Sequence, residues 1–129
     1  MKFSEMPYER VNFDEVKASF QRLEEELDKA SSGEEQMAVH RKYYELTGHV
    51  LTQMTLAEIR HDIDTTDDFY SEEQDFYDQN GPVFRNLCVS YQKKLYQSPY
   101  RAYLEKTIGK VAFKNIELGM KSVDDRILP

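Results

Sequence analysis

The chain has 129 residues, of which 40% are hydrophobic and 32% are charged, and its formal net charge is −7. This length is that of one ordinary domain, and the composition is neither that of a disordered chain nor that of a membrane protein. A negative net charge repels a phosphate backbone, and the basic residues are scattered along the chain, so nucleic-acid binding is disfavoured.

The first helix is predicted between Asn12 and Ala30. Apolar residues recur in this range at steps of three and four, which places them on one face of a helix. They are Phe13, Val16, Phe20, Leu23 and Leu27. Asn12 is a capping residue and Glu15 stands three positions after it, so the two form the pattern of a capping box.

The second and longest helix is predicted from Ser32, which can cap it with Glu35 three positions later. Its apolar stripe continues to Ala57. Gly48 within the stripe costs on the order of 1 kcal/mol relative to alanine. Because the connection to the first helix is short, the two helices are predicted to lie antiparallel as a hairpin.

A third helix is predicted to start within the acidic segment that follows Ile59, after a break at Thr65 and Thr66. Asp67, Asp68 or Ser71 can cap it. Proline lacks a backbone donor and clashes with the preceding turn, so Pro82 predicts a kink or a fresh start. The apolar pattern then continues to about Gln97.

Two short helices complete the prediction. Ser98 and Pro99 are a cap and first-turn pair, and Gly109 ends the helix that they open. A last helical pattern follows from Val111 to Met120, and no segment alternates as a strand does. The fold class is therefore all-α: an antiparallel helical hairpin extended by a kinked third helix and two short helices.

The single cysteine, Cys88, lies among apolar residues and has no nearby histidine in the sequence, which favours a buried structural thiol over a nucleophile. The acidic segment also has part of the pattern of a calcium-binding loop, with Asp62, Asp64, Asp68 and Glu73 at ligand positions. The sharp turn of such a loop needs glycine where the chain has Asp67, so a solvated, helix-capping acidic corner is favoured.

Two segments resemble the start of the oligoendopeptidase F family, the thimet-type zinc metallopeptidases. They are MKFSEMPYER at Met1–Arg10 and, within Ile59–Pro82, the stretch DIDTTDDFYSEEQDFYDQNGP. The resemblance is weaker over Gln97–Lys121. It implies a bilobed, mostly helical, cytoplasmic enzyme that hydrolyses short peptides in a deep channel. The N-terminal helices would wall this channel, and a later lobe would bind the zinc.

A peptidase of this type binds zinc through His-Glu-x-x-His on a helix, because residues four apart share a face. The histidines of this chain are His40, His49 and His61, and no pair has that spacing. The sequence therefore assigns no catalytic, cofactor-binding or metal-binding residue to this chain, and by the resemblance zinc belongs to the full-length enzyme. The chain alone is predicted to be inactive.

The sequence predicts one helical domain over residues 1–129, the N-terminal part of a longer peptidase. Its apolar last residues favour this interpretation. The expected partners are the catalytic lobe and, in the full-length enzyme, the peptide substrate. Neither a nucleic acid nor a membrane is expected as a partner, and a membrane is disfavoured because the N-terminus lacks the apolar stretch of a signal peptide and no apolar run could span a bilayer. The alternative is a free-standing helical adaptor or protein-binding module. A reading frame that continues into His-Glu-x-x-His would favour the peptidase.

Helices with apolar residues on two faces need a partner on each face. If the chain packs against a catalytic lobe, several large apolar side chains are left exposed without that lobe, and a homodimer of the fragment is the expected result. The candidate interface residues are Tyr44, Leu51, Tyr96, Phe113 and Ile127.

Overall fold

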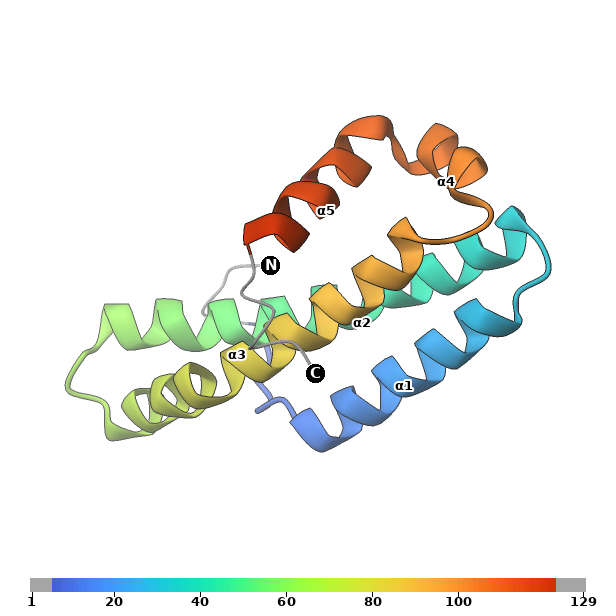
Figure 1. Ribbon diagram of the computed structural model, residues 1–129. Coiled ribbons are helices and arrows are strands. Elements are labelled where there is room, and N and C mark those ends of the chain that lie inside the picture. The colour runs from blue at the N-terminus through green and yellow to red at the C-terminus, as the bar shows by residue number, and fades with distance from the viewer. Residues whose placement is uncertain (1–5, 123–129) are drawn as a thin grey trace.

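The computed structural model describes residues 6–122, and over this range the chain is built from five α-helices without a strand (Figure 1). The all-α class predicted from the sequence is confirmed. None of the helices in this range is long and apolar enough to cross a membrane. The helices are α1 (Phe13–Lys29), α2 (Gly33–Ile63), α3 (Asp68–Tyr96), α4 (Arg101–Ile108) and α5 (Lys110–Ser122).

The three long helices form the body of the molecule. α1 and α2 run antiparallel, as the short connection between them predicted, and α3 returns alongside both, so that each of the three contacts the other two. The apolar stripe of α1 is buried in this body: Val16, Phe20, Leu23 and Leu27 are all at most 6% exposed. Burial of such side chains contributes about 1.5–3 kcal/mol each, which makes this contact the main source of helix stability.

The predicted caps of the first two helices are present. The Asn12 side chain accepts hydrogen bonds from the backbone N–H groups of Asp14 and Glu15, at 3.1 and 3.3 Å. Ser32 Oγ accepts from the backbone N–H of Glu35 at 3.1 Å. The Glu35 carboxylate closes back on Ser31, whose backbone N–H lies 2.6 Å away, and these bonds lower the pKa of Glu35.

α3 runs without interruption through Pro82, so the helix does not restart there. Figure 1 shows the two halves of α3 running in different directions, as expected where a proline removes one backbone hydrogen bond. Just before the proline, the side chain of Asn80 donates to the carbonyl of Phe76 at 2.8 Å.

α4 and α5 fold back over the long helices. α4 begins at Arg101, later than Ser98 and Pro99 predicted, because residues 97–100 first form a turn in which Ser98 Oγ accepts from the backbone N–H of Tyr100 at 3.0 Å. Gly109 ends α4 as predicted, with a φ of 115° that glycine adopts without strain. Leu104 is 0% exposed and packs this pair of helices into the core.

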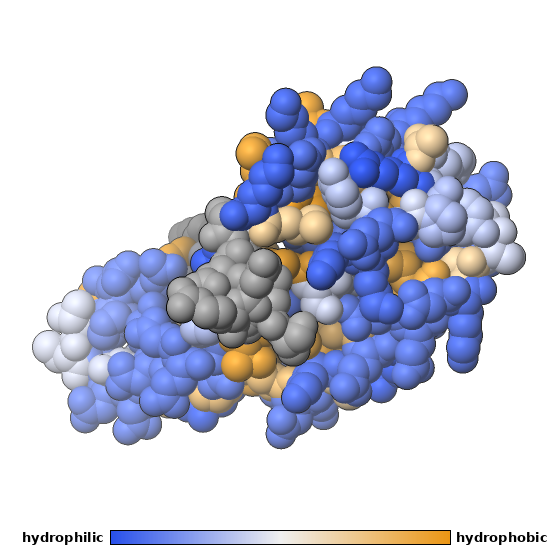
Figure 2. Space-filling model, viewed as in Figure 1, coloured by the Kyte–Doolittle hydropathy of each residue, from blue (hydrophilic) through white to orange (hydrophobic). Residues whose placement is uncertain are grey.

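Apolar surface gathers in the seam between the α4–α5 pair and the long helices, whereas hydrophilic side chains cover much of the outer surface in the same view (Figure 2). α5 contacts α3, and α4 contacts both α2 and α5. The core therefore extends from the three long helices into this seam.

Two glycines of α2 provide opposite tests of this packing. A Cβ atom added to Gly33 would lie 2.7 Å from Cγ and 3.0 Å from Cβ of Tyr103 in α4. We predict that Gly33→Ala lowers the free energy of unfolding by about 1–3 kcal/mol, because the Cβ of Tyr103 cannot rotate away. A Cβ added to Gly48 meets no atom within 4 Å, so Gly48→Ala should stabilise by about 0.5–1 kcal/mol. Urea unfolding measures both, and a stabilising Gly33→Ala would contradict the packing of α4 on α2.

Candidate functional site

Two clusters of polar and aromatic side chains stand out among the described residues. The first joins the segment before α1 to α3. Tyr8 donates its hydroxyl hydrogen to Glu73 at 2.6 Å, and the Arg10 guanidinium binds both carboxylate oxygens of Glu73, with Nε at 3.1 and 3.0 Å. Tyr77 Oη lies 2.9 Å from the Tyr8 hydroxyl and accepts from the backbone N–H of Val11 at 3.1 Å.

The ionisable groups of this cluster hold one another in their ordinary charge states at neutral pH. Glu73 is 1% exposed, and the hydrogen bond from Arg10 outweighs its burial and lowers the pKa of its carboxyl. The same bond raises the pKa of Arg10, while burial followed by the bond to Glu73 raises the pKa of Tyr8. Because all three groups are paired, the cluster is a structural anchor for the N-terminal segment.

The burial of Glu73 corrects one part of the sequence analysis, which placed this residue in a solvated acidic corner. Asp67 does cap a helix as predicted, because its side chain accepts from the backbone N–H of Phe69 at 2.8 Å. Asp64 accepts from both the backbone and the hydroxyl of Thr66, which lowers the pKa of its carboxyl. The sequence could not separate Glu73 from these residues, since its partners lie more than 60 positions away.

The second cluster is a groove between α2, α3 and α5, with a volume of about 540 Å³. We call it the aromatic groove. Its lining is His40, Tyr43, Tyr44, Thr47, Leu51, Phe84, Arg85, Cys88, Gln92, Leu95, Ile108, Ala112, Asn115 and Ile116.

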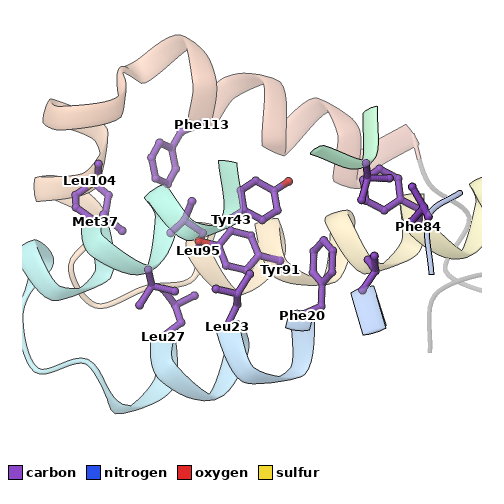
Figure 3. Close-up of a cluster of buried hydrophobic side chains, with 14 of the residues drawn as sticks. Phe20, Leu23, Leu27, Met37, Tyr43, Phe84, Tyr91, Leu95, Leu104 and Phe113 are labelled. Carbon is purple, nitrogen blue, oxygen red and sulfur yellow. The ribbon is translucent and has the colours of Figure 1, made fainter. Parts of the chain in front are cut away.

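Tyr43 in the lining of the aromatic groove rests on a stack of rings that continues into the core. Tyr43 and Tyr91 stack with centroids 4.1 Å apart and planes 9° apart, and Figure 3 shows both rings in the core among Leu95 and Phe20. The ring of His40 is nearly parallel to that of Tyr91, and its Nδ1 lies 3.1 Å from the Tyr91 hydroxyl. α2 thus presents a histidine to the groove that the sequence analysis did not single out.

His40 is 4% exposed, and burial lowers the pKa of its imidazole to about 4. A neutral ring can accept the Tyr91 hydroxyl hydrogen at Nδ1, while the buried Nε2 has no hydrogen-bond partner among the described residues. The ring of Tyr44 covers His40 edge-on, with centroids 4.6 Å apart. The histidine is therefore uncharged at neutral pH and contributes to an apolar surface.

The thiol of Cys88 also lines the aromatic groove, and burial raises its pKa to about 11. It is therefore a thiol at neutral pH rather than the thiolate that a nucleophile requires. Burial likewise raises the pKa of Tyr43 and of Tyr91. Over residues 6–122, no group of three or more His, Cys, Asp or Glu side chains is placed to hold a metal ion. The chemistry of the groove is that of a binding surface for apolar groups.

The five candidate interface residues differ in how much of each side chain is exposed. Tyr44 and Leu51 are 58% and 52% exposed, and both line the aromatic groove. Tyr96 is partly buried, with the Arg101 guanidinium 3.9 Å from its ring centroid.

The assignment of Phe113 to an exposed surface is wrong, because the residue is 1% exposed and packs in the core (Figure 3). The face of α5 that carries Phe113 packs against the long helices, and the apolar pattern of α5 alone does not indicate which of its faces is buried. Ile127 lies outside the described residues.

Comparison with known proteins identifies similar chains. The sequence profile of a family described as the peptidase M3 N-terminal domain matches residues 3–123. No curated protein sequence matches the chain at a significant level.

Three solved structures contain the same fold. A structure of PZ peptidase A with an inhibitor is 39% identical with a TM-score of 0.93, and the match covers 97% of this chain and 22% of that chain. An X-ray structure described as an oligoendopeptidase F is 39% identical with a TM-score of 0.94, covering 99% of this chain and 23% of that one. An oligoendopeptidase F from Bacillus anthracis str. Ames is 38% identical with a TM-score of 0.93, covering 98% and 23%. The chain therefore spans less than a quarter of the length of these relatives.

The anchor at Glu73 generates a pH-dependent prediction. At neutral pH, Glu73→Gln should lower the free energy of unfolding by about 2 kcal/mol, less than for a fully buried ion pair because the Arg10 side chain is 49% exposed. The folded-state pKa of Glu73 lies below the ordinary value of 4.5, so its stabilising effect is lost as the pH falls below 4.5 and through the folded-state pKa. The difference between wild type and variant should therefore shrink at about pH 3. Urea unfolding at both pH values measures it, with Glu72→Gln at the exposed neighbouring position as the control.

The buried imidazole of His40 predicts a different pH window. Because its folded-state pKa of about 4 lies below the ordinary value of 6.5, the unfolded state takes up the proton first and stability falls as the pH drops below 6.5. Between about pH 7 and pH 5 this loss should be about 2 kcal/mol. His40→Phe should remove it, whereas His49→Gln, at an exposed position of α2, should retain it. Equal pH slopes for wild type and His40→Phe would refute the buried neutral imidazole.

Proposed function

The chain belongs to the peptidase M3 N-terminal domain family, and on this premise we propose that it is the helical, channel-wall segment of a zinc-dependent oligoendopeptidase. The proposed enzyme hydrolyses short peptides in the cytoplasm, and this segment carries none of its zinc ligands. The observation that carries the proposal is the family match over residues 3–123 together with three structures that superpose on nearly the whole chain.

The proposed division of labour follows from the chemistry of the described residues. The chain has no His-Glu-x-x-His sequence to bind zinc and activate water. It does supply three long packed helices and an apolar groove. Such a rigid body suits a wall that shapes a channel, excludes folded proteins and leaves the hydrolysis to a second lobe. The proposed partners are accordingly the remainder of the peptidase and, in the full-length enzyme, the peptide substrate.

In the absence of the remainder, we propose that the chain pairs with itself. Tyr44 and Leu51 expose more than half of their surface, and each large apolar side chain that is left exposed forgoes roughly 1.5–3 kcal/mol of burial. A two-fold contact uses the same patch on both copies, which makes a homodimer the simplest product. Sedimentation equilibrium over a range of concentrations tests this, and a monomer at every concentration would contradict it.

We predict that the 129-residue chain alone, with stoichiometric zinc, does not hydrolyse a quenched fluorescent peptide. A chimera should do so: in the Bacillus anthracis relative, the matching 23% of the chain is replaced by this chain, and the unaltered relative serves as the positive control. Hydrolysis by the chimera should stop when a chelator removes the zinc.

Either of two results would contradict the proposal. One is chelator-sensitive hydrolysis by the purified chain alone. The other is a chimera that folds, as shown by cooperative thermal unfolding, but has no activity while the relative is active. The second result would favour a free-standing adaptor.

A further inference from the structure

The walls of the aromatic groove have the spacing of a helix-binding surface. α2 contributes His40, Tyr44, Thr47 and Leu51, which follow one another at steps of four, three and four. Residues at these steps lie on one face of a helix, and this stripe extends over about 16 Å at 1.5 Å per residue. A stripe of this kind runs along the groove rather than across it.

The facing walls repeat this pattern. α3 contributes Phe84, Cys88, Gln92 and Leu95, at steps of four, four and three. The third wall is on α5, where Ala112 and Ile116 stand four positions apart. When three helices present such rows to one groove, the spaces between their side chains accept the side chains of a further helix. The geometry therefore fits an α-helix better than an extended peptide.

The chemistry of the groove restricts what that helix can carry. The α2 wall is apolar on its surface, since Tyr44 and Leu51 are exposed and the imidazole of His40 is buried. Arg85 is the one charged residue in the lining, and it has no carboxylate partner among the described residues. A matching helix carries an apolar stripe with an acidic side chain placed toward Arg85.

The length of the related proteins indicates where such a helix comes from. The solved relatives contain this fold with TM-scores of 0.93 and 0.94, yet the match covers only 22–23% of their chains. More than three quarters of each relative is therefore available to cover the groove. A second copy of this chain is the weaker occupant and takes the groove only when the remainder is absent, because each copy has a net charge of −7 and the two repel each other.

We propose that the aromatic groove is the docking site for an apolar helix from the remaining part of the peptidase chain. This inference rests on the proposed function, and it adds the face and the residues through which the wall segment is held. Docking covers Tyr44 and Leu51, which removes their exposed apolar surface from water. It also seals the buried imidazole of His40 beneath a second layer of protein.

The test uses the chimera described above and the isolated chain, each with one substitution. At a dilution where the isolated chain is a monomer, Leu51→Glu should leave its Tm within about 2 °C, because Leu51 is 52% exposed there. In the chimera, the same substitution buries a carboxylate under the docked helix and should lower Tm by at least about 5 °C. Ile63→Gln is the matched control, since Ile63 is 75% exposed at the far end of α2, and it should change neither protein.

A labelling experiment covers the case in which the Leu51→Glu chimera does not fold. Leu51→Cys should react freely with a maleimide in the isolated chain, at a dilution where sedimentation shows a monomer. The same cysteine should react at least about tenfold more slowly in the chimera, which corresponds to 1.4 kcal/mol of protection. Ile63→Cys should react at similar rates in both proteins, with mass spectrometry identifying the labelled peptide.

The outcomes separate this inference from the proposed function. An unsubstituted chimera that folds but is inactive contradicts the proposed function. An active chimera in which Leu51→Cys reacts as fast as in the isolated chain refutes the docking site alone. Protection of Leu51→Cys in the isolated chain that grows with concentration is the mark of the homodimer proposed above, whereas protection in the chimera that disappears on dilution would assign the groove to a second copy there and overturn the inference.

Discussion

The buried carboxylate of Glu73 is the interaction on which the arrangement of this chain depends. An ionised carboxylate inside a protein costs several kcal/mol unless it is paired and hydrogen-bonded. Arg10 and Tyr8 supply the partners, and both come from the segment before α1. This segment must therefore lie against α3, and the hydrogen bond from the backbone N–H of Val11 to Tyr77 holds its end beside the same helix. α1 starts directly after this contact, so the anchor determines how its apolar face meets the other helices.

Aromatic side chains from α1, α2 and α3 pack together in the centre of the three-helix body. Phe20 of α1 contacts Tyr43 of α2 and Phe84 of α3 edge-on, with centroids 6.0 and 6.2 Å apart. Tyr43 in turn stacks on Tyr91. Such contacts add about 0.5–1.5 kcal/mol each beyond the area that they bury, and they require defined ring orientations. Tyr43 and Phe84 also line the aromatic groove, so the packing of the core fixes this part of its shape.

This arrangement supports the proposed role as one wall of a larger enzyme. The polar anchor is complete within the described residues, because each charged group has its partner. The aromatic groove lies between α2, α3 and α5, and it is apolar and partly exposed. A surface of this kind gains stability only when another apolar surface covers it. The chain therefore combines a self-sufficient interior with one face suited to a partner.

The sequence correctly predicted the fold class and the antiparallel hairpin. It also predicted the caps at Asn12 and Ser32 and the helix end at Gly109. These features were predictable because capping, periodicity and left-handed backbone depend on residues a few positions apart. The start of α4 was predicted too early, at Ser98 and Pro99. Ser98 instead forms a turn, in which its hydroxyl accepts from the backbone N–H of Tyr100, and the helix begins only at Arg101.

The burial of Glu73 and Phe113 and the position of His40 in the groove were decided by the tertiary structure. Each depends on a partner or a packing helix that is distant in the sequence, and no local pattern records which face of a helix meets it. Local chemistry thus determined which helices form. The pairing of a buried charge and the packing of aromatic rings decided how they assemble and which surface they leave open.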